Sequence, residues 1–382
     1  MLIYGILLLL VGLYGATLSI VNMLAMRSYA PKSQEIITDG PMISVLIPAR
    51  NEETSLPATL EAMIVQNYKN FEVLVCDDNS TDGTWEVISR YAQMDKRIRG
   101  IQGRPLVDGW RGKVYAMEQM LHQAKGEIVL ITDADIHHAP NSLSYGYSAL
   151  IKNRVDMVSG YARESVRSLW TQVLISASLF ITVFYVLLPL QRKFPKPFFA
   201  MAIGQYLMVR TSVLRSMGGF SCMKHVVTDD IELAKQVVKH GYKQQFLDLN
   251  HILRVTMYEQ FSDAFTGISR SVYHLTGQRS PLIFLFVVLA LFLLGTSLFV
   301  SFCVFIYQMI ALGNPSLSVL LAITGSILLY LGWIASALFH NYRLSTALLG
   351  HFVFILVGWA YLYGMYLKIS KRGMVWRGRP LT

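Results

Sequence analysis

Five long stretches without a charged side chain constrain this chain more than any other feature of its sequence. They cover residues 2–26, 168–190, 281–312, 316–339 and 344–367. Each stretch reaches the roughly 20 residues that a helix needs to cross the hydrocarbon core of a membrane. More than half of the 382 residues lies outside these stretches. We therefore expect membrane helices combined with a soluble domain.

The distribution of charge indicates how these parts are arranged. The net charge is +10, and the basic residues gather beside apolar stretches, as is typical next to anionic lipid headgroups. No basic stripe alternates with aromatic residues, so we do not expect nucleic acid as a partner. The first stretch has no basic n-region and no clean cleavage site, which favours a retained anchor over a signal peptide. We predict a multi-pass cell-membrane protein: a transmembrane anchor at 1–27, a cytoplasmic domain at 40–280, membrane helices at 281–369 and a basic tail at 370–382. These patterns leave the oligomeric state open.

The cytoplasmic domain alternates two kinds of sequence pattern. Short runs rich in β-branched and apolar residues predict strands at 43–49, 71–76 and 127–132. Between them, helical periodicity predicts helices at 55–66, 82–91 and 113–123. Such alternation is typical of βαβ units with right-handed crossovers. The predicted fold class is therefore α/β, a doubly wound and mostly parallel sheet.

Polar residues gather where the predicted strands end, at 50–53, 77–80 and 133–135. In sheets of this kind, ligands bind outside the carboxyl ends of the strands. Asp133 and Asp135 would present two carboxylates at that edge, and a hard divalent cation prefers oxygen ligands. The alternative is that Asp133 caps a turn and Asp135 is solvated. Likewise, 77–83 could be only a turn that leads to a helix cap.

Two adjacent histidines follow the Asp-Ala-Asp segment. Neighbouring side chains on an extended segment point in opposite directions, so at most one of His137 and His138 could reach a bound ion.

Five short motifs follow one another along the domain. They are Ile-Pro-Ala-Arg-Asn-Glu-Glu at 47–53, Asp-Asp-Asn-Ser-Thr-Asp at 77–82, Gly-Lys at 112–113, Asp-Ala-Asp at 133–135 and Thr-Asp-Asp-Ile-Glu-Leu at 228–233. In this order they resemble the inverting family 2 glycosyltransferases, whose nucleotide-sugar-binding fold is called type A. The resemblance covers roughly residues 43–251 and implies that fold, with a UDP-sugar as the donor.

The resemblance also implies roles for individual residues. Those implied to bind the donor are Ala49, Asn51, Glu52, Asp77, Asp78, Lys113, Asp133 and Ala134. Asp135 is implied to ligate a Mg or Mn ion on the donor diphosphate, and Asp230 matches the general base. Those implied to bind the acceptor are Gly204, Gln205, Asp229 and Arg270. The family commonly has Glu-Asp where this chain has Asp229-Asp230, and an acidic helix N-terminus favoured by the helix dipole would explain these two residues locally.

Further segments resemble family members that glycosylate membrane lipids, namely bacterial carotenoid-acid glucosyltransferases and, more distantly, ceramide glucosyltransferases. Among these segments are Gly-Trp-Arg-Gly-Lys at 109–113 and Trp-Arg-Gly-Arg at 376–379. Processive polysaccharide synthases usually carry Gln-x-x-Arg-Trp, whereas this chain has Gly-Ile-Ser-Arg-Ser at 267–271. We therefore expect inverting transfer of a single hexose, glucose by preference, to a lipid acceptor such as a carotenoid acid. The alternatives are a sphingolipid or hopanoid-type acceptor, polysaccharide synthesis, and a membrane protein that binds nucleotides without catalysis.

Two apolar stretches are expected to depart from simple membrane crossing. A basic tail should stay in the cytoplasm, so we predict that 281–312 bends at Gly295 into a hairpin. For 168–190, we predict one amphipathic helix in the headgroup plane, with its polar side under the catalytic domain. That side comprises Ser168, Thr171, Gln172, Ser176, Ser178 and Thr182. The alternative is a true span whose small polar residues pack against neighbouring helices.

Overall fold

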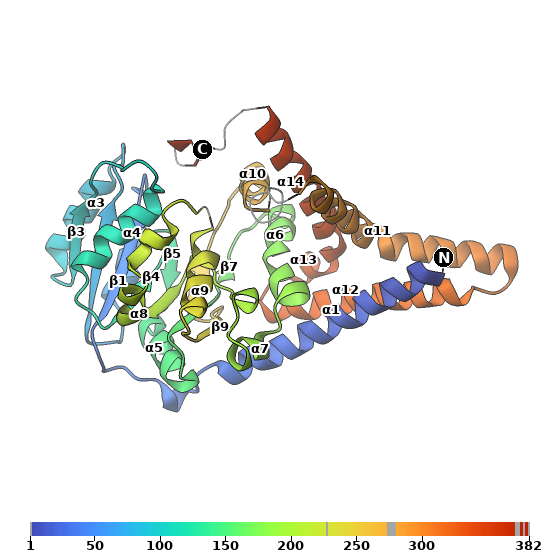
Figure 1. Ribbon diagram of the computed structural model, residues 1–382, viewed down its shortest axis with the longest axis horizontal. Coiled ribbons are helices and arrows are strands. Elements are labelled where there is room, and N and C mark those ends of the chain that lie inside the picture. The colour runs from blue at the N-terminus through green and yellow to red at the C-terminus, as the bar shows by residue number, and fades with distance from the viewer. Residues whose placement is uncertain (1, 227, 273–279, 371–374, 377–378, 381–382) are drawn as a thin grey trace. The chain divides into compact units, whose positions relative to one another are not determined.

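The computed structural model describes residues 2–226, 228–272, 280–370, 375–376 and 379–380. The chain divides into two compact units that alternate along the sequence. The α/β unit comprises Ala25–Ser165 and Leu188–Thr256, and the membrane unit comprises Met1–Leu24, Val166–Leu187 and Met257–Thr382. In Figure 1 the membrane unit joins the blue first helix to the orange and red helices of the last third of the chain.

The α/β unit is built on a seven-stranded sheet with the strand order β3-β2-β1-β4-β8-β6-β9. The strands are β1 (Ile43–Ala49), β2 (Phe71–Asp77), β3 (Ile98–Gln102), β4 (Ile128–Ile131), β6 (Met157–Tyr161), β8 (Leu207–Arg210) and β9 (Gln244–Asp248). Strand β8 runs antiparallel to both β4 and β6, whereas the other neighbours pair in parallel. The predicted doubly wound, mostly parallel α/β sheet is confirmed.

Helices cover both faces of this sheet because successive strand residues point to opposite sides. Val45 is buried with α2 (Leu56–Ile64), α3 (Thr84–Met94) and α5 (Ser142–Asn153). The next residue, Leu46, is buried on the other face with α4 (Gly112–Gln123), α8 (Thr211–Ser216) and α9 (Asp229–Lys239). Strands buried on both faces read as continuous apolar runs.

Smaller elements complete the α/β unit. A three-stranded sheet has the order β5-β10-β7, formed by Ile136–His138, Leu253–Val255 and Arg163–Glu164. The short helix α7 spans Leu188–Lys193. Single 3-10 turns lie at Ser33–Glu35, Pro197–Phe199 and Gly219–Met223.

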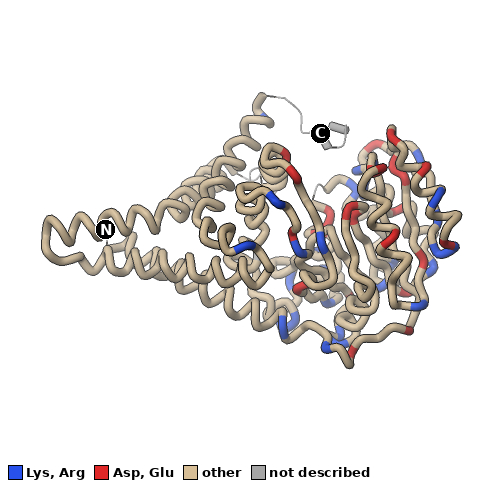
Figure 2. Tube along the Cα trace, turned by 180° about the vertical axis from the view of Figure 1, so that it is seen from behind, with Lys and Arg blue, Asp and Glu red and all other residues tan. Residues whose placement is uncertain are grey.

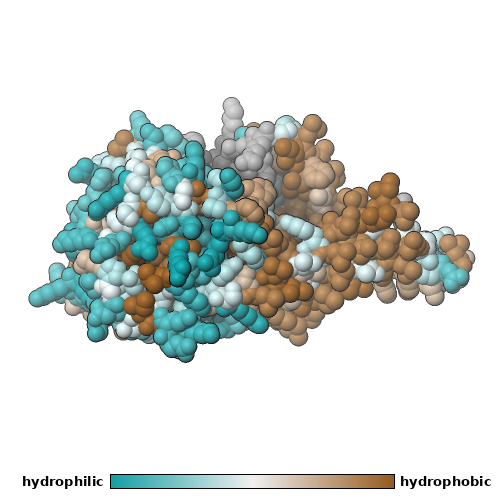
Figure 3. Space-filling model, turned by 60° about the horizontal axis from the view of Figure 1, so that its bottom comes forward, coloured by the Kyte–Doolittle hydropathy of each residue, from teal (hydrophilic) through white to brown (hydrophobic). Residues whose placement is uncertain are grey.

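The membrane unit contains four helices that are long and apolar enough to cross a membrane, judged by length and composition within the described residues. They are α1 (Leu2–Tyr29), α11 (Pro281–Leu312), α12 (Leu317–Phe339) and α14 (Gly350–Ile369). The tube in Figure 2 carries almost no charge along these helices, and Figure 3 shows their visible surface as mostly apolar. Shorter helices α10 (Phe261–Val272) and α13 (Leu344–Leu348) belong to the same unit.

Small residues bring α1 and α12 into backbone contact. A Cβ added to Gly12 would overlap the carbonyl group of Gly325, and one added to Gly332 would lie 2.9 Å from the Cα of Ala16. Membrane helices associate closely through such small-residue surfaces, since lipid tails supply little hydrophobic drive between helices.

The prediction of a hairpin in 281–312 is wrong. Helix α11 is continuous from Pro281 to Leu312, and Gly295 is buried within it. A Cβ at Gly295 would lie 2.6 Å from the Ile355 side chain and 3.2 Å from the His351 carbonyl oxygen of α14. The glycine therefore permits close approach of α14 rather than a bend. The cytoplasmic location of the tail stays a prediction, and most of 370–382 lies outside the described residues.

The segment 168–190 is not one helix, which corrects the prediction of a single amphipathic helix. It consists of α6 (Leu169–Ile175), a 3-10 turn (Ser176–Leu179), a π-helical turn (Ile181–Tyr185) and then α7. Its polar side chains also lie inside the membrane unit: the Thr346 hydroxyl donates to the Gln172 side chain at 2.7 Å, and the Asn22 amide donates to the Thr182 carbonyl at 2.6 Å. In this packing the polar groups contact neighbouring helices, because buried hydroxyl and amide groups need partners there. The location of the segment in the headgroup plane stays a prediction.

Candidate active site

The carboxyl ends of β1, β2 and β4 lie at one edge of the sheet and carry the predicted site residues. Ala49 at the end of β1 is opposite Asp77 at the end of β2, and the Asp78 N–H donates to the Ala49 carbonyl at 2.8 Å. Strand β4 ends two residues before Asp133. Ala49 thus presents only its backbone at this edge of the sheet, since its side chain is buried in the core.

Two loops at this edge are held together by Asn51 and Glu52. Asn51 adopts a φ of 53°, a left-handed conformation that asparagine tolerates well, and its side-chain oxygen accepts from the Thr81 N–H at 2.9 Å. The Glu52 N–H donates to the Thr84 hydroxyl at 2.8 Å, and the Asp77 carboxylate accepts from the Ser80 N–H at 2.9 Å. These bonds fix the loop backbones. The roles of Asn51, Glu52, Asp77 and Asp78 in binding a nucleotide stay predictions.

Helix α2 fixes the Asp-Ala-Asp segment. The Thr59 hydroxyl lies 2.8 Å from the Ala134 carbonyl oxygen and 3.0 Å from that of Ile136. Ala134 is buried, while Asp133 and Asp135 on either side of it are half-buried. Thr59 is a positioning residue that sequence reasoning missed, because a single hydroxyl on an apolar helix face carries no motif.

Lys113 links the Asp-Ala-Asp segment to α9. Its ammonium group lies 2.7 Å from Asp133 Oδ1 and 3.6 Å from Asp229 Oδ2. Burial on its own lowers the pKa of Lys113, but the carboxylates of Asp133 and Asp229 outweigh burial and raise this pKa above its ordinary value. Lys113 is therefore a fixed positive charge between two acidic segments that lie almost 100 residues apart in the sequence.

Asp230 occupies the first turn of α9 beside this ion pair. Its Oδ2 accepts from the Gly204 N–H at 2.9 Å, and its Oδ1 accepts from the Ile231 N–H at 2.8 Å. Burial, followed by the adjacent Asp229 carboxylate, raises the pKa of Asp230, against the opposing effects of these N–H groups and of Lys113. A carboxylate whose proton affinity is raised in this way is suited to accept a proton near neutral pH.

The predicted acceptor residues fall in different places. Gly204 lies within the site, since a Cβ added there would be 3.4 Å from the Lys113 ammonium and 3.7 Å from Asp230. Gln205 is buried, and its carbonyl accepts from the Thr132 hydroxyl at 2.9 Å. Arg270 lies on α10 in the membrane unit, so it is not among the residues that the α/β unit brings together. Acceptor binding by these residues stays a prediction.

Of the two histidines after the Asp-Ala-Asp segment, the first is exposed and the second is buried. His138 is buried, and its two ring nitrogens lie 2.9 Å from the Thr132 hydroxyl and 3.0 Å from the Ser142 hydroxyl. Burial, then the charge of His137, lowers the pKa of His138 to about 3, so the ring is neutral. His138 is therefore a core residue and is not available to a bound ion. Of these two histidines, His137 is the exposed one.

The residues at this edge fit a divalent cation held jointly with a substrate. Within the described residues, no group of three or more His, Cys, Asp or Glu side chains forms a ready-made metal cage. Mg²⁺, however, is usually bound by one or two carboxylates, with phosphate and water oxygens completing its coordination. Asp133, Asp229 and Asp230 also outnumber the single ammonium of Lys113, so the site has an excess of negative charge that a cation would offset.

The fold and this site define the class of the protein: an α/β protein with the type A fold of glycosyltransferases. A mannosyltransferase from Pyrobaculum calidifontis, solved with GDP-mannose and Mn²⁺, superposes with a TM-score of 0.53 at 18% identity, over 94% of this chain and 99% of that one. Residues 44–218 match the family described as glycosyl transferase family 2. This segment of the chain is therefore similar to family 2 glycosyltransferases.

Two curated relatives show where the sequence similarity lies. One is a UDP-Glc:α-D-GlcNAc-diphosphoundecaprenol β-1,3-glucosyltransferase of Escherichia coli, 33% identical over 27% of this chain and 39% of the relative. The other is a β-monoglucosyldiacylglycerol synthase of a Nostoc species, 26% identical over 52% of this chain and 42% of the relative. In each case the matching region spans less than half of the relative's length.

Proposed function

We propose that this protein transfers a single hexose, with glucose as the preferred sugar, from a UDP-sugar to a membrane lipid, with inversion at the anomeric carbon. The observation that carries the proposal is the group formed by Lys113, Asp133, Asp229 and Asp230, on a chain with four helices able to cross a membrane. The name of the first relative includes a lipid-linked sugar, and that of the second includes a glucosylated diacylglycerol, which supports a lipid acceptor.

The proposal gives a step to each charged group. The acceptor hydroxyl attacks the anomeric carbon from the face opposite the leaving UDP, and Asp230 takes its proton. Lys113 holds positive charge beside Asp133, on the side where the donor diphosphate would lie. Asp133 and Asp135 would hold Mg²⁺ or Mn²⁺, which when bound offsets the charge that builds on the leaving diphosphate.

A carotenoid acid is our first choice of acceptor, on the sequence resemblance described above. Diacylglycerol is the second, because the Nostoc relative matches 206 residues, the longer of the two matches described. Transfer of one sugar rather than many is favoured by Ser271 at the position where processive synthases usually have a tryptophan.

Membranes containing the wild-type protein or its Asp230→Asn variant, incubated with labelled UDP-sugars and the candidate lipids, test the proposal. Extracted lipids are separated and identified by mass spectrometry. We expect one labelled lipid that carries a single hexose. For a hydroxyl acceptor, its labelling should be at least about a hundredfold slower in the variant. Label in a polymer, or equal labelling of a hydroxyl acceptor by the two proteins, would rule the proposal out.

A further inference from the structure

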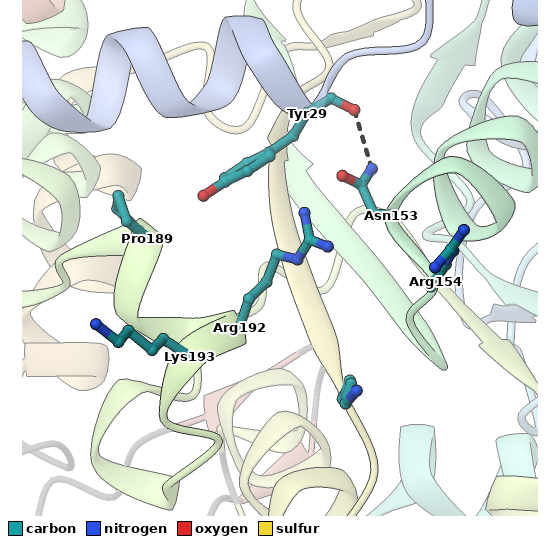
Figure 4. A pocket seen from close by; sticks show the side chains of 7 residues that line it. Tyr29, Asn153, Arg154, Pro189, Arg192 and Lys193 are labelled. Carbon is teal, nitrogen blue, oxygen red and sulfur yellow. Dashed lines mark hydrogen bonds between the residues drawn. The ribbon is translucent and has the colours of Figure 1, made fainter.

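A basic hollow of about 500 Å³ lies in the α/β unit, away from the candidate active site. Its lining includes four cationic side chains, Arg154, Arg192, Lys193 and Lys243, and no carboxylate. Figure 4 shows the Arg192 guanidinium directed into the space between Tyr29 and Asn153, while Lys193 extends to the side. The polar rim is fixed, since the Asn153 amide donates to the Tyr29 carbonyl at 2.9 Å.

The four cations of the hollow have no acidic partner within the described residues. None of them takes part in an ion pair there. Two carboxylates on adjoining segments have other cationic partners. Glu35 pairs with Lys152 at 3.1 Å, and Asp156 pairs with Arg210 at 3.5 Å and accepts from the backbone N–H of Lys243 at 2.9 Å. Gathered cations repel one another, so a bound anion would stabilise the hollow.

The hollow lies at the opposite edge of the sheet from the catalytic carboxylates. Arg154 precedes β6 and Lys243 precedes β9, so both stand at the amino ends of strands parallel to each other. Through the antiparallel β8, these strands run in the same direction as β4, whose carboxyl end leads to Asp133. A ligand here is therefore separated from the donor by the length of the sheet, and it is not the sugar acceptor.

One wall of the hollow is formed by the end of an apolar helix. Tyr29 is the last residue of α1, which is apolar enough to span the bilayer. The segment that carries Arg192 continues into Phe194 and Phe198, whose side chains are 48% and 62% exposed. Apolar rings beside a cluster of cations suit a ligand that has both acyl chains and a phosphate.

We propose that this hollow binds the headgroup phosphate of an anionic glycerophospholipid, with Arg154, Arg192 and Lys243 as its cationic contacts. Guanidinium groups bind phosphate oxygens through paired, charge-assisted hydrogen bonds. The bound lipid fixes the end of α1 against the sheet edge that is opposite the active site. The site is a lipid anchor, and its occupancy does not require donor or acceptor.

Native mass spectrometry of the full-length protein in detergent tests this proposal. The protein is titrated with phosphatidylglycerol or with phosphatidylcholine of the same acyl chains. The test variant combines Arg154→Asn with Arg192→Gln; asparagine is chosen because residue 154 has a φ of 50°. The matched control combines Arg90→Gln with Lys96→Gln, which removes two charges from the region of α3.

We expect the wild-type protein and the control to retain phosphatidylglycerol in preference to phosphatidylcholine. The test variant should bind phosphatidylglycerol at least about tenfold more weakly, since each cation near an anionic lipid contributes about fivefold. Arg192→Lys should keep most of the binding, which separates loss of charge from loss of fold. Equal retention of the two lipids, or equal loss in the control, would overturn the proposal. Displacement of the lipid by glycerol 3-phosphate at the same concentration would also overturn it and would indicate a site for a soluble phosphate.

Discussion

Replacement of Asp230 by asparagine separates proton transfer from binding more sharply than any other change at the site. The side chain keeps its size and one acceptor oxygen. It loses the ability to take a proton, and it can no longer accept from both the Gly204 and Ile231 N–H groups, since its amide nitrogen is a donor.

The expected loss of turnover exceeds the expected loss of stability. Loss of a general base lowers the rate by about 10² to 10⁴-fold, and a hundredfold corresponds to about 2.7 kcal/mol in the activation barrier. One buried N–H left without an acceptor costs about 1–3 kcal/mol of folding free energy. We therefore expect a folded variant that binds the donor with turnover reduced at least about a hundredfold.

The assay follows labelled sugar transfer to a hydroxyl acceptor across a range of pH, with Asp229→Asn as the matched control. In the wild type, kcat/KM should rise with pH through the raised pKa of Asp230, because only the ionised carboxylate accepts the proton. Asp229→Asn removes a neighbouring negative charge, so its acid limb should move to lower pH. An acceptor that is itself a carboxylic acid is already ionised, and the loss in Asp230→Asn should then be smaller.

Two results would refute this reasoning. Wild-type turnover in Asp230→Asn, together with a large loss in Asp229→Asn, would mean that Asp229 is the base. An acid limb that stays in place when Asp229 is neutralised would mean that Asp230 does not set the pH dependence.

Three further predictions concern the metal, the membrane helices and the tail. Asp135→Asn and Asp133→Asn should abolish transfer while the thermal unfolding midpoint stays near that of the wild type, and full activity in chelator-treated membranes would contradict a metal role. Gly12→Leu should destabilise the protein by about 1–3 kcal/mol, because the side chain would collide with the Gly325 backbone. Thermal unfolding in detergent measures this against Leu13→Ala, whose side chain is exposed. A cysteine placed at Thr382 should react only with reagents admitted to the cytoplasmic side, and labelling from outside alone would contradict a cytoplasmic tail.

Sequence patterns predicted the α/β unit well because local signals and tertiary burial agree there. Strand β1 has the predicted bounds, Ile43–Ala49, since it is buried on both faces and is followed by polar residues. Helix α4 begins at Gly112, one residue before its predicted start. The contact of Lys113 with Asp133 follows from the predicted α/β sheet. Its contact with Asp229 depends on the placement of α9, which no local sequence pattern encodes.

The membrane unit was predicted less well because hydropathy says little about which helices pack together. Gly295 suggested a bend in α11, whereas the structure shows that a glycine is needed there because α14 packs closely against it. The π-helical turn Ile181–Tyr185 has a distant partner in Asn22, which donates to the Thr182 and Val186 carbonyls from more than 150 residues away. The basic hollow was missed as a unit because Tyr29, Arg154, Arg192 and Lys243 come from four separate segments.

The two helices of the α1–α12 contact are synthesised at different times. Gly12 leaves the ribosome 313 residues before Gly325, an interval of about 15–60 s at 5–20 residues per second. By the end of this interval every strand of the seven-stranded sheet, through Asp248, has been made, whereas α1 has had no close-packed partner. The seven-stranded sheet is thus able to form before α1 meets α12, and the membrane unit is completed last, around the helix that was made first.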